Sequence, residues 1–165
     1  MTAPTAAPTA PLTSTVDRFL DAVAAGAVTA DLYADDVVLD AVVPDWRFAV
    51  AGPAAVAAEY ARWFADPARI EELRRLRTAT GEVVEYTLCW TEQGVPHAAR
   101  HVHVLDLGAD GRIVADHVWC GGRWPAALLA EMEGERASTE RQRGRSGTSP
   151  ESSIDTEMEA ARDAH

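Results

Sequence analysis

The sequence of 165 residues contains no lysine: its 15 basic residues are all arginines, set against 26 acidic residues and a formal net charge of −11. No basic cluster occurs in the part of the chain that we expect to fold. Nucleic acids and anionic membrane surfaces are polyanions, which an acidic protein repels. The composition therefore argues against a nucleic-acid or membrane partner.

Cysteine is scarce as well, and the two that occur, Cys89 and Cys120, show no metal-type spacing. Both fall inside predicted strands, so we expect buried free thiols in a reducing compartment. The first residues, MTAPTAAPTAPLTS, contain neither a basic start nor an apolar run. We therefore expect no signal peptide and no membrane anchor, and a cytoplasmic protein.

The length and the 47% hydrophobic content suit one domain with polar ends. Residues 1–13 are a Pro/Ala/Thr tract that cannot build a core, and residues 134–165 are charged and Ser-rich. Both ends are expected to be disordered. The folded domain is predicted over residues 14–133.

The order of helical and strand-like patterns indicates an α+β fold. The segment 70–79 contains helix formers, but the strand that follows it needs a partner, so we predict a strand there. The predicted elements are helices at about 15–25, 29–33, 53–65 and 125–133, a helical turn at 67–69, and strands at 37–43, 47–51, 70–79, 83–91 and, within 97–124, two more joined by the turn 108–111.

The hairpin within residues 97–124 places side chains alternately on two faces of a sheet. If Leu107 faces Arg112 across the turn, His103 lies directly opposite Asp116, close enough to interact. One face then collects His97, His101, His103, Leu105, Val114, Asp116, Val118 and Cys120, and the other collects Val102, Val104, Ile113, Ala115, His117 and Trp119.

A two-residue loop at 93–94 predicts a second hairpin, with Tyr86 opposite His101 and Trp90 opposite His97. Both loops have an even length, so one inner face continues across three strands. A histidine beside a carboxylate among apolar neighbours on that face indicates a pocket. Its predicted wall consists of Phe19, Leu39, Tyr60, Trp63, Tyr86, Leu88, Trp90, Val118 and Cys120.

Three interpretations of the histidine and carboxylate remain open. Asp116 could orient His103 as a general acid or base, with Tyr86 and His101 as hydrogen-bonding partners for the substrate. The pair could instead brace a small core, because buried polar groups need partners. His101, His103 and Asp116 also have the ligand types of a two-histidine, one-carboxylate metal site. No supporting groups around such a site are evident, so no metal or other cofactor is predicted.

Asp40 is a further candidate, because it lies on a predicted strand near the pocket. One change of register would turn its side chain inward, where it could act as a second acid or base.

Four phrases of the sequence carry a resemblance in their order and spacing: VDRFLDAVAAG, LYADDVVLDAVVP, GPAAVAAEYARWF and GADGRIVADHVW. From about Thr15 to Trp124 the chain resembles the nuclear transport factor 2-like superfamily. That superfamily includes SnoaL-like polyketide cyclases, ketosteroid isomerases and limonene epoxide hydrolases. The resemblance implies a cone-shaped α+β fold, with helices packed on a curved, mostly antiparallel sheet around a deep pocket.

The catalytic residues of the isomerases, of the cyclases and of the epoxide hydrolases are each incomplete at the matching positions of this sequence. The isomerase's phenol donor, base and protonated acid fall on Phe19, Ala41 and His103, the cyclase pair on Asp116 and Val118, and the hydrolase pair on His101 and His103. Two functions follow. The first is a cofactor-independent isomerase, cyclase or hydratase that transfers protons on an apolar, oxygenated molecule such as a polyketide or steroid-like compound. The second is a non-catalytic small-molecule-binding or interaction module.

The outer, convex sheet face is unusually apolar for a face turned to water. Arg100 is expected to lie opposite Trp119, where it could stack on the indole ring. An exposed apolar patch indicates an interface, so we predict a homodimer through the convex face. The alternative is that the tail or the helix at 125–133 covers this face.

Overall fold

The computed structural model describes residues 14–146, which divide at Ala126 into two units. Residues 1–13 and 147–165, for which disorder was predicted, lie outside the described residues. The elements of the first unit are α1 (Thr15–Ala25), η1 (Ala30–Leu32), β1 (Tyr33–Val43), β2 (Trp46–Ala51), α2 (Pro53–Trp63), β3 (Ala68–Arg77), β4 (Gly81–Glu92), β5 (Val95–Leu107), β6 (Ile113–Cys120) and β7 (Trp124–Pro125). Helix α3 (Ala126–Ser146) forms, from Ala127 onward, the described part of the second unit.

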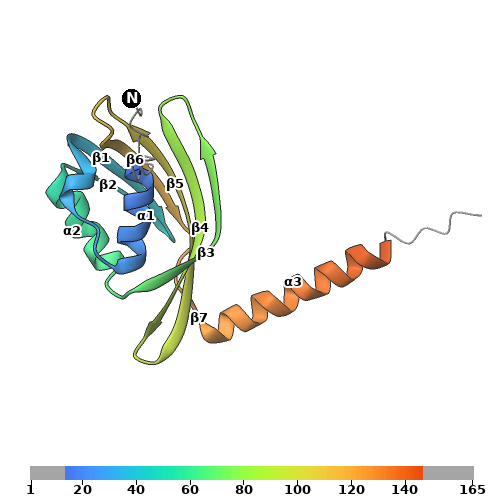
Figure 1. Ribbon diagram of the computed structural model, residues 1–165. Coiled ribbons are helices and arrows are strands. Elements are labelled where there is room, and N and C mark those ends of the chain that lie inside the picture. The colour runs from blue at the N-terminus through green and yellow to red at the C-terminus, as the bar shows by residue number, and fades with distance from the viewer. Residues whose placement is uncertain (1–13, 147–165) are drawn as a thin grey trace, which may run out of the picture. The chain divides into compact units, whose positions relative to one another are not determined.

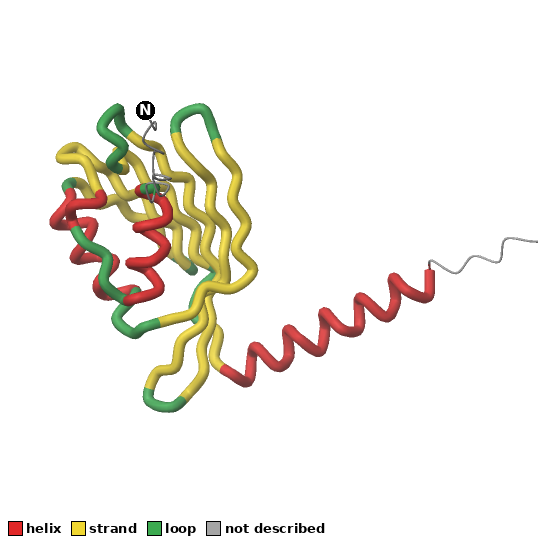
Figure 2. The backbone as a smooth tube through the Cα atoms, viewed as in Figure 1, coloured by secondary structure: helices red, strands yellow, loops and turns green. Residues whose placement is uncertain are grey.

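The strands form one sheet in the order β2-β1-β6-β5-β4-β3, with β7 paired to β5. β1 and β6 run parallel and every other pair is antiparallel. The long strands curve, and α1 and α2 lie together on one side of them (Figure 1, Figure 2). The predicted α+β fold on a curved, mostly antiparallel sheet is confirmed.

Local sequence explains where α1 begins and ends. Ser14 and Asp17 form a capping box in which each side chain accepts a hydrogen bond from the other's backbone N–H, both at 3.1 Å. Gly26 ends the helix in the left-handed conformation that glycine adopts readily. The helix buries Val16, Phe19, Leu20 and Val23. These side chains join the core with α2 and the inner sheet face.

The strand predicted at 70–79 is confirmed as β3, which pairs antiparallel with β4. The helical turn predicted at 67–69 is wrong, because β3 already begins at Ala68. Pairing with β4 overrides the helix propensity of this segment. β3 is one of the two edge strands, and its exposed charged side chains disfavour pairing with another chain at that edge.

The hairpin between β4 and β5 has the predicted register, with Tyr86 opposite His101 and Trp90 opposite His97. The β5–β6 register differs from the prediction because Leu107 faces Ile113 and the pairing then shifts. The shift is typical of a β-bulge, which interrupts the alternation of side chains. Ile113 therefore points into the core, where it is fully buried, and the prediction that it lies on the convex face is wrong.

Helix α3 corrects the prediction for the end of the chain. Pro125 belongs to β7, and the helix runs to Ser146 and does not end near Glu133. The disorder predicted from Gly134 onward is therefore wrong for residues 134–146. This stretch contains four arginines and two glutamates, whose helix propensity helps to offset the cost of about 1 kcal/mol for each of its two glycines. Among the described helices, none combines the length and apolarity needed to cross a membrane.

Candidate functional site

The histidine and carboxylate singled out from the sequence touch in the structure. His103 Nδ1 lies 3.0 Å from Asp116 Oδ1, and both side chains are 0% exposed. The predicted contact is confirmed, although the predicted register is wrong. His103 directly faces Val118, and Asp116 directly faces Leu105, so the contact is diagonal. A diagonal neighbour on the same face is still within reach of a long side chain.

Two tyrosines extend this pair into a chain of hydrogen bonds. Tyr60 Oη donates to Asp116 Oδ2 at 2.5 Å, and Tyr86 Oη lies 3.0 Å from His103 Nε2. Burial, followed by the nearby Asp116 carboxylate, raises the pKa of both tyrosines well above the usual value. Both therefore keep their protons, and Tyr60 donates to the carboxylate, which can only accept.

The tautomer of His103 follows from its contact with Asp116. A carboxylate only accepts, so Nδ1 carries the proton of the neutral imidazole and donates to Asp116, which leaves Nε2 to accept from Tyr86. Every proton in the chain thus points toward the carboxylate. We refer to Tyr86, His103, Asp116 and Tyr60 as the buried relay.

Aromatic and aliphatic side chains enclose the buried relay tightly. The Phe19 ring meets the His103 ring edge-on with centroids 5.1 Å apart, and the Tyr86 ring lies nearly parallel to it at 5.6 Å. The predicted wall residues Phe19, Leu39, Tyr60, Tyr86 and Val118 are all 0% exposed. In this conformation, protein side chains fill the space around the relay.

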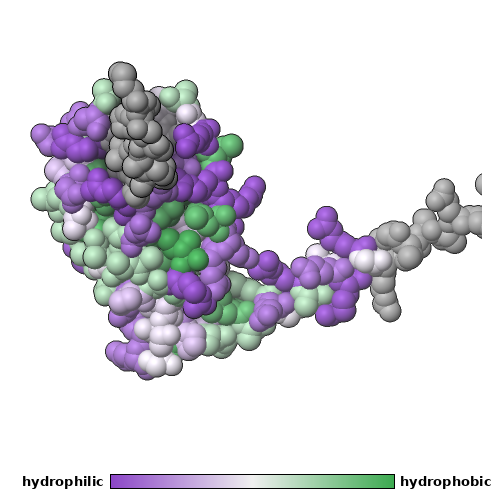
Figure 3. Space-filling model, viewed as in Figure 1, coloured by the Kyte–Doolittle hydropathy of each residue, from purple (hydrophilic) through white to green (hydrophobic). Residues whose placement is uncertain are grey.

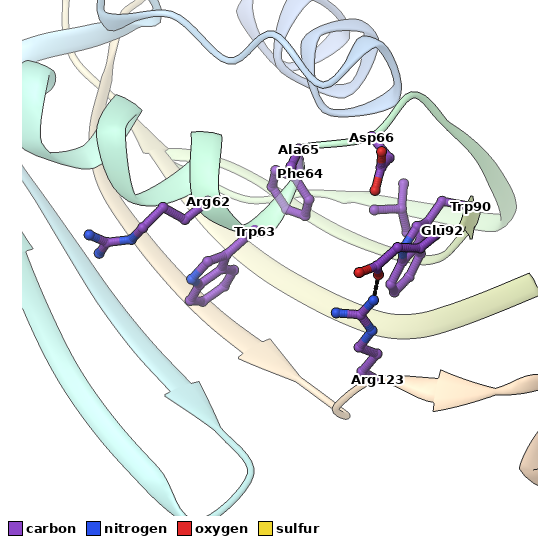
Figure 4. A pocket seen from close by; sticks show the side chains of 9 residues that line it. Arg62, Trp63, Phe64, Ala65, Asp66, Trp90, Glu92 and Arg123 are labelled. Carbon is purple, nitrogen blue, oxygen red and sulfur yellow. Dashed lines mark ion pairs between the residues drawn. The ribbon is translucent and has the colours of Figure 1, made fainter. Parts of the chain in front are cut away.

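A cavity of about 140 Å³ opens beside the end of α2 (Figure 4). It is comparable to a cavity of about 150 Å³ that binds benzene. Three predicted wall residues, Trp63, Leu88 and Trp90, contribute to it. Its full lining is Arg62, Trp63, Phe64, Ala65, Asp66, Leu88, Trp90, Glu92 and Arg123.

Phe64 stands between this cavity and the polar interior. Its side chain lines the cavity and is itself only 2% exposed. On the other side, the ring meets His101 edge-on at 5.6 Å and stacks on Tyr60 at 5.3 Å. His101 in turn stacks on Tyr86, which belongs to the relay. Phe64 therefore lies between the cavity and His101, while Trp63, which also lines the cavity, meets Tyr60 of the relay edge-on at 5.6 Å.

Two buried polar atoms have no hydrogen-bond partner among the described residues: His101 Nδ1 and Tyr33 Oη. Burial, followed by the neighbouring His103, lowers the pKa of His101 to about 3, so its ring is neutral at physiological pH. Burial raises the pKa of Tyr33 well above its usual value. An unpaired buried polar group costs about 1–3 kcal/mol. Both atoms are therefore available to a polar group that enters the interior.

Acidification should destabilise the protein through His101. An unfolded histidine binds a proton below a pH of about 6.5, whereas folded His101 stays neutral down to about 3. The unfolded state thus holds more protons in this window, so the free energy of unfolding falls as the pH falls. Between pH 6.5 and 5 the loss is about 2 kcal/mol.

Urea unfolding at a series of pH values measures this loss. His101→Phe keeps a ring against Tyr86 but cannot titrate, so the dependence should flatten. The matched control His117→Gln, at a half-exposed histidine, should keep the wild-type dependence. A dependence unchanged in His101→Phe would contradict the assignment.

Asp40 does not face the interior, so the prediction that it acts as a second acid or base is wrong. Its strand neighbours Leu39 and Ala41 take the inward positions, and Asp40 pairs with His117 of β6 on the opposite face. Arg47 holds the carboxylate with two hydrogen bonds, of 3.0 and 2.7 Å. This interaction lowers the pKa of Asp40.

Cys120 faces His101 at the end of β6 and is half-buried. Its sulfur accepts a hydrogen bond from the Gly122 N–H at 3.4 Å. Cys89 is also half-buried, so the predicted full burial of both thiols is wrong. Cys120 lies outside the lining of the cavity described above.

The geometry does not favour the metal alternative. Asp116 and Tyr86 engage both ring nitrogens of His103, which leaves no lone pair for a metal ion. Residues 14–146 contain no group of three or more His, Cys, Asp or Glu side chains arranged to hold one.

Several residues that define the site were missed from the sequence. Asp66 directly precedes the helical turn predicted at 67–69 and was not assigned to the site, and Arg123 follows two glycines in a stretch without periodicity. Tyr33 was assigned to the end of a short helix, whereas it begins β1. Extending the inward alternation of β1 backwards would have been the available signal for Tyr33, but a register shift between Tyr33 and Val38 interrupts it.

Comparisons with known proteins establish the fold. No protein-family model and no curated protein matches the sequence. A nuclear transport factor 2-like protein from Anabaena variabilis is similar in structure, with a TM-score of 0.57, 17% identity, and coverage of 66% of this chain and 84% of that one. The epoxide hydrolase/cyclase-like enzyme SalBIII, described in pyran ring formation in salinomycin, gives a TM-score of 0.52, 16% identity, and coverage of 65% and 88%.

A third similar structure is a protein with a ketosteroid isomerase-like fold from Catenulispora acidiphila, in complex with trimethylamine. It gives a TM-score of 0.51, 18% identity, and coverage of 68% of this chain and 88% of that one. The chain is thus an α+β protein with the nuclear transport factor 2-like fold, as the sequence resemblance implied.

Proposed function

We propose that the protein is a small, cofactor-independent enzyme that transfers protons on a largely apolar, oxygenated small molecule. The observation that carries this proposal is the buried relay, in which Asp116 orients His103 and leaves Nε2 as the basic atom. A histidine held in this way by a carboxylate is suited to general acid–base catalysis.

The relay suggests how such a step would proceed. Substrate would displace the Tyr86 hydroxyl from His103 Nε2, and that nitrogen would take a proton from the substrate. The Asp116 carboxylate, held by Tyr60, would stabilise the resulting imidazolium. The unpaired Nδ1 of His101 would meet the oxygenated group of the substrate.

Phe64 would control entry, because it separates the cavity from His101. Rotation of its ring would join the cavity to the relay. The apolar lining of Trp63, Leu88 and Trp90 would hold the hydrocarbon part of the substrate.

Exchange of α-protons in small cyclic ketones, such as cyclopentanone in D₂O, tests proton transfer without knowledge of the natural substrate. The wild-type protein should accelerate deuterium incorporation, measured by NMR, above the buffer rate. His103→Gln should lower the acceleration by about 10²-fold or more, because general-base catalysis of this kind contributes 10²–10⁴-fold.

Phe64→Ala should raise the exchange rate for bulkier ketones by opening the path to the relay. Trp46→Ala, at a side chain that is 69% exposed, is the matched aromatic control and should behave as wild type. Equal rates in wild type and His103→Gln would rule out His103 as the base.

The second candidate function is a non-catalytic small-molecule-binding module. The complete burial of His103 and Asp116 favours it, because this conformation leaves the relay no contact with the cavity. The same ketones distinguish the two functions. Binding without accelerated exchange, in both the wild type and Phe64→Ala, would support the module.

We also propose a homodimer through the convex face, the sheet face turned away from α1 and α2. Trp119 is 47% exposed there and Val38 43% exposed, on the adjacent strands β6 and β1. Arg100 does not lie opposite Trp119 as predicted: Val102 does, and Arg100 pairs with Glu85. The indole therefore remains available to a second copy.

Sedimentation velocity should show a wild-type dimer and a monomeric Trp119→Glu variant that keeps the wild-type circular dichroism spectrum. A wild-type protein that sediments as a monomer at high concentration would contradict the dimer.

A further inference from the structure

One of the charged side chains around the cavity has no partner among the described residues. Two of the four ionisable side chains in its lining, Glu92 and Arg123, form an ion pair with each other. Arg62 forms an ion pair with Glu59, and its guanidinium points away from the other labelled side chains (Figure 4). These three charges are therefore compensated locally.

Asp66 is the exception. Its carboxylate has no hydrogen bond or ion pair to any residue within 14–146, although the side chain is half-buried. In Figure 4 it points toward the side of the cavity that Trp90 and Glu92 form. A partly desolvated carboxylate without a partner favours a positive charge nearby. The net charge of −11 adds to this preference by attracting cations to the whole surface.

The walls of the cavity suit the same kind of ligand. Trp63, Phe64 and Trp90 present three aromatic side chains to it. The Arg123 guanidinium lies 5.6 Å from the centre of the Trp90 ring, so a cation already occupies one aromatic surface here. Aromatic faces attract organic cations by about 0.5–2 kcal/mol per contact.

We propose that the cavity binds a small organic cation, an alkylammonium group on an apolar body no larger than about one six-membered ring. Asp66 supplies the opposite charge, and Trp63, Phe64 and Trp90 supply apolar and aromatic contacts. The volume of about 140 Å³ sets the size of the body. This inference deepens the proposed function, because it assigns a chemical class to the molecule that enters through this cavity.

Three probes with the same ring and different charges test the proposal: benzylammonium, benzyl alcohol and benzoate. Binding is measured by calorimetry and by tryptophan fluorescence at low ionic strength. Benzylammonium should bind about tenfold more tightly than benzyl alcohol, which corresponds to about 1.4 kcal/mol. Benzoate should bind most weakly.

Substitutions then identify the charges responsible. Asp66→Asn should lower the affinity for benzylammonium about tenfold, to the level of benzyl alcohol, and leave benzyl alcohol unchanged. Asp36→Asn removes the same charge from an exposed position of β1 outside the lining, and should have no effect. Arg123→Gln frees both Trp90 and Glu92, so it should tighten benzylammonium binding several-fold. A loss of benzylammonium affinity in Arg123→Gln would contradict the proposal.

Equal or tighter binding of benzyl alcohol or benzoate overturns the proposal, as does an unchanged benzylammonium affinity in Asp66→Asn. The exchange assay uses uncharged ketones, so it tests the proposed enzyme independently of the cation site. Ketone exchange without benzylammonium binding would leave the enzyme standing and remove the cation site. Benzylammonium binding without ketone exchange would support the cation site and contradict the proposed enzyme.

Discussion

Asp116→Ala should lower the free energy of unfolding by about 3 to 5 kcal/mol. The substitution removes the acceptor of two buried hydrogen bonds, one from Tyr60 Oη and one from His103 Nδ1. Each orphaned donor costs about 1–3 kcal/mol, because no water reaches it. The missing side chain adds a small cavity among fully buried neighbours. Guanidinium unfolding followed by tryptophan fluorescence measures the loss.

Asp40→Ala is the matched control on the neighbouring strand. Its carboxylate also makes two hydrogen bonds, but to the exposed Arg47, so the loss should stay within about 1 kcal/mol. Similar losses in the two variants would show that the relay contributes no more to stability than a surface ion pair does.

Gly81→Ala should destabilise the protein by about 3 kcal/mol, although it adds only one methyl group. A Cβ at this position would lie 1.9 Å from the Leu105 carbonyl oxygen and 2.9 Å from its carbonyl carbon. Both atoms belong to the backbone of the paired strand β5, so no side chain can rotate away. The strands β4 and β5 would have to separate locally, close to the strand that carries His103.

Gly134→Ala is the matched glycine control, because no atom lies within 4 Å of its added Cβ. It should leave the unfolding of residues 14–126 unchanged. The tryptophans report on that unit selectively, since all five lie within it. A Gly81→Ala variant as stable as Gly134→Ala would mean that the two strands are not held as closely as described.

Periodicity in the sequence predicted most of the fold. Alternation and an even two-residue loop were sufficient for the register of β4 on β5, which placed Tyr86 opposite His101. The contact between His103 and Asp116 was also predictable, because both share one face whether they are directly or diagonally opposed. The resemblance to the nuclear transport factor 2-like superfamily also predicted that helices pack on the curved sheet.

The remaining features depend on geometry that periodicity does not contain. The register shift at Leu107 and Ile113 adds a residue to one strand, and no residue type in that turn predicts such a shift. Asp40 lies one position from its inward-facing neighbours in β1. Predicting which face its side chain lies on therefore required the exact pairing of β1 with β6. The cavity arises where the end of α2 meets β4 and Arg123, segments far apart in the sequence.

Figure 3 shows apolar and polar residues side by side on one face of the first unit. The exposed Leu73 and Leu76 of β3 are accompanied by arginines and glutamates along the same strand. Such mixing limits self-association through this edge.

The parallel pairing of β1 with β6 has a consequence for biosynthesis. β1 and β2 emerge early from the ribosome, yet the strand that β1 adjoins is the last long one to be made. Contacts so distant in sequence close slowly and late. The edge of β1 that pairs with β6 therefore stays unpaired until Ile113–Cys120 has been synthesised. Because that strand carries Asp116, assembly of the buried relay and closure of the sheet become the same event, and a chain stopped before it would expose an edge open to aggregation.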